Sequence, residues 1–152
     1  MASIDLARAG VRQDHTDTEK RRAVINTSAR LFLLLGGANA ALVVVLGAFG
    51  AHALKARLSS EMMAIYHTGI EYNVFHALGL IAVGLVAAWI PDSPSLKWSG
   101  WLMLAGIVLF SGSLYLLSLT GQRWLGAVTP FGGVALIAAW IMFCVAVIRG
   151  MS

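Results

Sequence analysis

The sequence predicts an all-α membrane protein, an antiparallel up-down bundle of four transmembrane helices. Of its 152 residues, 59% are hydrophobic and only 12% are charged, whereas a soluble domain carries about 25% charged residues. Four stretches, 31–54, 72–91, 98–122 and 124–148, contain no Asp, Glu, Lys or Arg. Each is long enough to cross a hydrocarbon core, which needs about 20 helical residues. The stretches show no period-two alternation, so helices are predicted and a barrel is excluded.

The chain divides into two parts. Residues 1–29 form a polar N-terminal segment containing RQDHTDTEKRR at 12–22, which is too polar to fold alone and is expected to need a partner or the membrane surface to become ordered. Residues 30–150 form the transmembrane domain, with spans at about 31–54, 62–90, 98–119 and 129–148.

Local signals mark where the helices begin and end. Ser59 is a suitable N-cap for the second helix, and the run from Pro91 to Pro94 separates the second helix from the third. A third turn is expected near 120–123. Thr129 and Pro130 fit the start of the last helix. Because all the connections are short, neighbouring helices are expected to be antiparallel.

The flanking cations predict that both termini are cytoplasmic. Short loops on the cytoplasmic side of a membrane protein are enriched in Lys and Arg. With the N-terminus inside, the cytoplasmic set is Lys20, Arg21, Arg22, Arg30, Lys97 and Arg149, and the outer set is Lys55, Arg57 and Arg123. The first apolar run is longer than the core of a signal peptide, so we expect no cleavage after Ala53. The cations are therefore assigned to topology, and no nucleic-acid partner is expected.

Small residues recur at helical spacing and predict close helix packing. Gly36, Asn39, Gly47 and Gly50 share one face of the first span, and such faces let two backbones approach in lipid. The third and fourth spans carry small residues seven apart. These two ladders, which include the packing candidates Gly106 and Gly132, are Ser99, Gly106, Ser113 and Thr120, then Gly132, Ala139 and Ala146.

Polar residues gather in the predicted outer half of the second and third spans. This polar cluster consists of Asn73, His76, Ser111, Ser113 and Tyr115. Ionisable groups inside a span are costly and often functional. His76 shares a face with Gly69, Asn73 and Leu80, so we expect a neutral ring that points into the bundle. Its N–H should bond either to the third helix or to a neighbouring carbonyl.

The polar residues suggest two possible chemical sites, a metal site and a serine–histidine catalytic site. His52, His67, Glu71 and His76 are the candidate metal ligands, because imidazole and carboxylate groups can hold zinc. They form no HxxxH or HExxH pair and diverge on the helical wheel, so we expect no metal site. Ser111 or Ser113 with His76 would lack an orienting carboxylate on the same face, so no catalytic residue and no cofactor are predicted.

Four short motifs occur in order along the chain: GAFGAHALK after the first span, FHAL at 75–78, LFSGSLYLL at 109–117 and TPFGG at 129–133. Together they resemble the YgdD/YwdK family of small four-helix membrane proteins of unknown function, whose eukaryotic relative is transmembrane protein 256. The resemblance covers about 31–148. It implies four helices and a bacterial inner membrane, and it implies no reaction. His67 and Glu71 depart from that pattern, and the extension 1–29 is longer than it predicts.

Three classes of function remain open. The leading one is an accessory or structural subunit of a membrane complex, with the lipid bilayer and either a larger complex or a homo-oligomer as partners. The alternative is a small oligomeric transporter or channel with a polar outer-half site, although no proline interrupts a span and no repeat halves are evident. The second alternative is a membrane metal-binding protein or enzyme.

Overall fold

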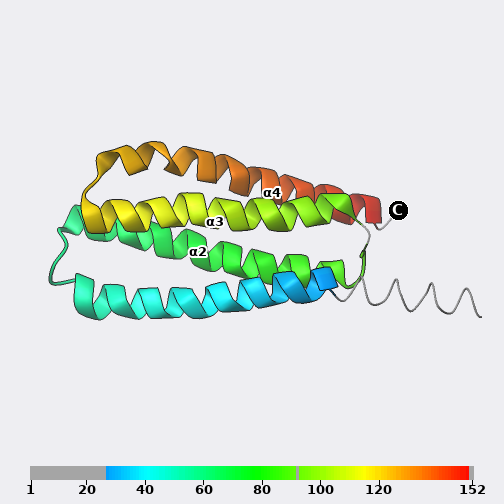
Figure 1. Ribbon diagram of the computed structural model, residues 1–152, viewed down its shortest axis with the longest axis horizontal. Helices are drawn as coiled ribbons and strands as arrows, with labels where there is room; N and C mark the ends of the chain where they lie inside the picture. The colour runs from blue at the N-terminus through cyan, green and yellow to red at the C-terminus, as the bar shows by residue number, and fades with distance from the viewer. Residues whose placement is uncertain (1–26, 92, 151–152) are drawn as a thin grey trace, which may run out of the picture.

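The computed structural model describes residues 27–91 and 93–150, and it confirms an all-helical fold with antiparallel neighbours. Four long helices lie side by side along one axis (Figure 1). They are the first helix, Thr27–Leu54, followed by α2, Ser60–Ala87, α3, Pro94–Thr120, and α4, Thr129–Gly150. A short 3-10 segment, η2, Arg123–Ala127, precedes α4. The N-terminal segment expected at 1–29 falls almost entirely outside the described residues.

Helix ends follow the predicted signals. Ser59 is the N-cap of α2, and its side chain accepts a hydrogen bond from the Met62 amide at 3.2 Å. Ser93 caps α3 in the same way, with Pro94 in the first turn. The helix α3 ends at Thr120, and its C-cap is Gly121, whose φ of 71° lies in the left-handed region that glycine adopts without strain. Local sequence therefore determines where each turn falls.

The first helix does not end as a regular α-helix. Its last five residues, Gly50–Leu54, form a π-helical turn, η1, in which the Lys55 amide bonds to the Gly50 carbonyl at 3.1 Å. A π turn contains more residues than an α turn, so it changes the direction of the side chains that follow it. His52 lies within this turn and is exposed.

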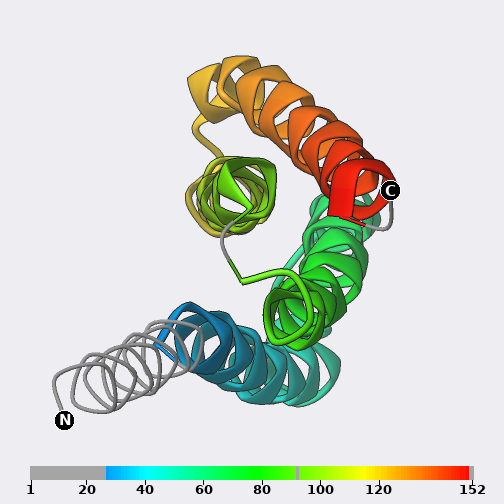
Figure 2. The same ribbon diagram turned by 90° about the vertical axis from the view of Figure 1, so that its right-hand side faces the viewer.

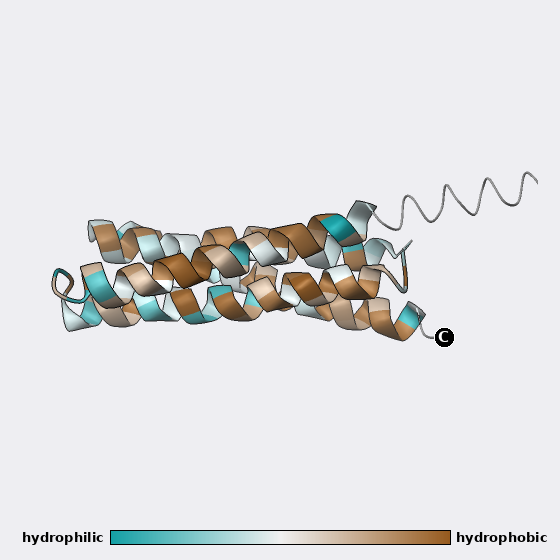
Figure 3. Ribbon diagram, turned by 90° about the horizontal axis from the view of Figure 1, so that it is seen from below, coloured by the Kyte–Doolittle hydropathy of each residue, from teal (hydrophilic) through white to brown (hydrophobic). Residues whose placement is uncertain are grey.

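The helices α2 and α3 occupy the middle of the bundle. Seen down the long axis, they lie between α4 and the first helix, and the first helix runs beside α2 (Figure 2). The core consists of buried apolar side chains from all four helices, among them Phe32, Leu80, Met103 and Leu136. When the ribbon is coloured by hydropathy, polar residues are concentrated towards the helix ends and apolar residues lie between them (Figure 3). Such a distribution fits four helices that cross a bilayer.

The small-residue ladders of α3 and α4 face each other. Ser99, Gly106 and Ser113 are buried on α3, and Gly132, Ala139 and Ala146 are buried on α4. A methyl group added at Gly106 would overlap the Leu136 side chain, and one added at Gly132 would overlap the backbone of Phe110. The expected Thr120 position is exposed, because α3 ends there.

The glycines of the first helix divide into two groups. A Cβ at Gly36 would lie 2.9 Å from both the Ala77 carbonyl oxygen and the Ile81 amide, and one at Gly50 would lie 2.7 Å from the Tyr66 ring. Gly47 differs, because a Cβ there would meet no atom within 4 Å. The packing contact that the sequence predicted at Gly47 is therefore wrong within this chain. The wheel gives the direction of a residue but not the distance to the neighbouring helix.

We predict that Gly36→Ala destabilises the bundle by about 1–3 kcal/mol, because the added methyl group would press on the backbone of α2. The matched control is Gly37→Ala, one residue further on, where a Cβ meets nothing within 4 Å. That variant should be neutral or slightly stabilising, since alanine is the better helix former. Unfolding free energies in mixed detergent micelles would compare the two, and equal effects would contradict the close contact at Gly36.

Candidate functional site

The structure divides the residues of the predicted polar cluster among three separate hydrogen-bonded groups, and Ser111 belongs to none of them. The first joins α2 to α3: Asn73 Nδ2 donates to the Tyr115 hydroxyl at 3.2 Å. Asn73 is 2% exposed, so this bond is in the interior. The Tyr115 ring contacts the Tyr66 ring, with centroids 5.2 Å apart. In turn, the Tyr66 hydroxyl donates to the Leu46 carbonyl of the first helix at 2.7 Å. Side chains from two helices and the backbone of a third thus form one connected group.

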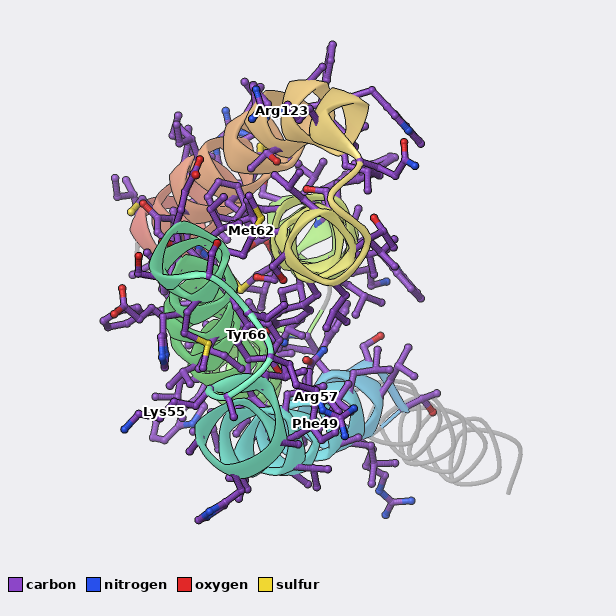
Figure 4. All side chains as sticks on the ribbon, turned by 90° about the vertical axis from the view of Figure 1, so that its left-hand side faces the viewer. Phe49, Lys55, Arg57, Met62, Tyr66 and Arg123 are labelled. Atoms are coloured by element: carbon purple, nitrogen blue, oxygen red, sulfur yellow. The ribbon has the colours of Figure 1, made fainter. Side chains whose placement is uncertain are left out.

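Tyr66 is the residue that the predicted cluster omitted. It is 1% exposed and is the largest of the fully buried side chains. Figure 4 looks onto this end of the molecule and shows Tyr66 between α2 and the first helix, with Lys55 pointing away from the bundle. Tyr66 is seven residues before Asn73, so the two lie on the same face of α2. This spacing in the sequence could have identified Tyr66 as a member of the cluster.

The second group involves His76. Its Nδ1 lies 2.6 Å from the Tyr72 carbonyl oxygen, one turn earlier on α2, and therefore donates to it. The ring is 7% exposed, stacks on the Tyr72 ring and lies near Trp140 of α4, with centroids 6.0 and 6.3 Å away. Of the two partners expected for His76, the neighbouring carbonyl is the one found. The bond keeps Nδ1 protonated and leaves Nε2 as the acceptor nitrogen.

The third group joins α3 to α4. Ser113 Oγ donates to the Phe110 carbonyl at 2.9 Å and lies 2.9 Å from Thr129 Oγ1. Thr129 was expected only as a helix cap, yet it forms this contact between helices. No hydrogen bond links His76 to Ser111 or Ser113 within the described residues, so they do not assemble a serine–histidine pair.

Four buried polar atoms have no partner within the described part of the chain: Asn39 Oδ1, Asn73 Oδ1, Ser99 Oγ and Ser111 Oγ. Asn39, Asn73 and Ser111 come from three different helices. A buried polar group without a partner costs about 1–3 kcal/mol unless water or a ligand satisfies it. Their desolvation is therefore a cost that the packing of the bundle must offset.

The candidate metal ligands lie apart. His52, His67 and Glu71 are exposed, whereas His76 is buried. Among residues 27–91 and 93–150, no three His, Cys, Asp or Glu side chains lie close enough to hold a metal ion. No ion pair of Glu71 with His67 or Arg57 is found in the same part of the chain.

We predict that Tyr115→Phe lowers the unfolding free energy by about 1–2 kcal/mol, because it leaves the buried Asn73 amide without its partner. The control is Tyr72→Phe, since Tyr72 is 42% exposed and its hydroxyl has no hydrogen bond within the described residues. That change should cost less than about 0.5 kcal/mol. The unfolding free energies of both variants, measured in detergent, would test this prediction. Equal losses of unfolding free energy would argue against a structural Asn73–Tyr115 bond.

Residues 46–133 match the model of a family described as a protein of unknown function, DUF423. The chain is 50% identical over 120 residues to the UPF0382 membrane protein YwdK of Bacillus subtilis, covering 79% of this chain and 98% of that protein. It is 44% identical over 120 residues to a UPF0382 membrane protein of Staphylococcus epidermidis, covering 79% and 97%. A Staphylococcus saprophyticus relative is 43% identical over 116 residues, covering 76% and 95%. No solved structure matches.

Proposed function

We propose that this chain, which belongs to the UPF0382 (DUF423) family of membrane proteins, is an accessory or structural subunit of a membrane complex. The observation that carries the proposal is the unequal burial of its helices. In their most apolar windows, α2 and α3 are each 44% buried, whereas the first helix is only 17% buried. Most of the first helix therefore contacts either lipid or another membrane protein.

The exposed side of the first helix is unusual for a surface that faces lipid tails. It presents four exposed small residues at helical spacing, which we call the small-residue stripe: Gly37, Ala41, Ala48 and Ala51. The larger exposed side chains of Leu34, Val44 and Val45 lie among and beside them. Small residues let a neighbouring helix approach closely, which is how helices associate in lipid. Gly47 lies beside the stripe. A Cβ there would meet no atom within 4 Å, so the neighbouring helix could also approach at Gly47.

The last helix, α4, provides the contrast. It is also poorly buried, at 22%, but between Phe131 and Ile148 it exposes no glycine or alanine, whereas the first helix exposes both small and large residues. The large exposed side chains of α4 include Phe131, Val134, Ile137 and Ile141. Such side chains fill space against lipid tails without help from another helix. We therefore assign the docking role to the first helix and the lipid-facing role to α4.

A photoreactive amino acid at Ala48, in cells that express the full chain, would test the docking role. We expect a discrete cross-linked product from Ala48 and none from the same substitution at Ile137, which is 63% exposed on α4. A product containing two copies of the chain would identify a homo-oligomer, and one containing another membrane protein would identify a complex. Identical products at both positions, or none at Ala48, would refute the assigned face.

The proposed orientation places both termini in the cytoplasm of a bacterial cell. It is supported by the flanking cations of the sequence, six on the proposed cytoplasmic side against three on the outer side. In a Cys144→Ser background, cysteines at Gly10 and Ser93 should be protected from an impermeant thiol reagent in intact cells, and one at Ser59 should react. The substitution of Cys144 is needed because that thiol is exposed. Labelling in the reverse pattern would invert the topology.

A further inference from the structure

A pocket of about 420 Å³ lies where α2 ends, α3 begins and α4 ends. Its walls include Trp89, Ser93, Ser95 and Arg149. The last turn of α4 is held against α2 here, because Gly150 packs on Ile90 so closely that a Cβ would lie 2.6 Å from its side chain. This contact brings Arg149 to the pocket. The volume is within the range of about 300–1,000 Å³ that is usual for small-ligand sites.

Among the residues that line the pocket, Arg149 is the charged one. Arg149 is exposed and forms no ion pair within the described residues. Lys97 is exposed in the first turns of α3, and Arg30 is exposed near the start of the first helix. The sequence has one carboxylate in the turn between α2 and α3, Asp92, against these three cations. The guanidinium of Arg149 is therefore available to an anion and has the planar geometry that suits phosphate.

The wall of the pocket adds neutral donors. Ser93 Oγ accepts from the Leu96 amide at 3.3 Å, so its own O–H can still donate. The Ser95 amide is in the first turn of α3 and has no hydrogen-bond partner within the described residues, and its hydroxyl lies on the same wall. Arginine, hydroxyl and amide donors together make a site for an oxyanion.

The position of the pocket favours a lipid over a soluble anion. Trp89 is 87% exposed at the end of α2, and Trp98 is 61% exposed near the start of α3. Exposed tryptophans at helix ends are typical of the headgroup level of a bilayer. Basic pockets between transmembrane helices on the cytoplasmic side are sites where anionic lipid headgroups bind.

We propose that this pocket binds the phosphate of an anionic phospholipid, with Arg149 as the charged ligand, Ser93 and Ser95 as neutral donors, and Trp89 beside the glycerol backbone. The site is at the opposite end of the bundle from the Asn73–Tyr115 group. It does not depend on the accessory role or on the small-residue stripe, and it rests on the proposed orientation, in which this end of the bundle is cytoplasmic.

The test uses the full-length protein, delipidated in detergent and titrated with phosphatidylglycerol or phosphatidylcholine, with bound lipid counted by native mass spectrometry. We expect phosphatidylglycerol to bind more tightly than phosphatidylcholine. Arg149→Gln should weaken phosphatidylglycerol binding about tenfold, because a hydrogen bond to a charged group is lost. The control is Arg123→Gln, which removes an exposed arginine near Trp124 at the other end of the molecule. It should change binding less than about twofold.

Three results would overturn the proposal. Equal losses from Arg149→Gln and Arg123→Gln would mean that net charge, and not the pocket, attracts the lipid. Equal binding of the two lipids would exclude recognition of an anion. Displacement of the lipid by millimolar inorganic phosphate would identify free phosphate as the ligand. Thermal unfolding of both variants checks that each is folded, and Trp89→Ala is a second variant that should weaken binding without removing charge.

Discussion

Close approach of helix backbones at glycine is the constraint on which the rest of this structure depends. At Gly36 the first helix approaches the backbone of α2, and at Gly84 a Cβ would lie 2.9 Å from the Leu33 amide of the first helix. At Gly132 the helix α4 approaches the backbone of α3. Lipid tails offer no hydrophobic driving force between helices, so van der Waals contact must supply the association energy. A side chain at any of these positions would separate two helices and remove contacts along their length.

The polar groups depend on this spacing. The Asn73–Tyr115 bond crosses between α2 and α3 in the region where Gly69 lies against the Tyr115 ring, with a Cβ position 2.8 Å from Tyr115 Cε1. Tyr66 reaches the Leu46 carbonyl because Gly50 leaves room for its ring. The interior is therefore organised by pairs of one glycine and one tyrosine, which combine close packing with a hydrogen bond. This arrangement gives Tyr66, Asn73 and Tyr115 a structural role.

Much of the fold could be predicted from the sequence, because hydropathy and span length are properties of single segments. Ser59 and Ser93 act as caps through bonds to residues three positions away. The site was less predictable. Asn73 and Tyr115 could be assigned to one level, but the bond between them depends on how the two helices are rotated. His76 bonds to its own helix, and Gly47 meets nothing. A helical wheel shows neither which atom His76 bonds to nor how far Gly47 lies from a neighbouring helix.

The length of α2 has a consequence for how the protein fits its bilayer. Its 28 residues extend about 42 Å at 1.5 Å per residue, whereas the hydrocarbon layer is roughly 30 Å thick. If Trp89 marks one boundary of that layer, the other boundary falls about 20 residues earlier, near Gly69. His67 then lies among the headgroups and Glu71 only just below them, so both polar side chains can extend to water. Thickness of the surrounding membrane therefore determines whether Glu71 is hydrated. A thicker bilayer would bury its carboxylate, and the helix would respond by a change of tilt.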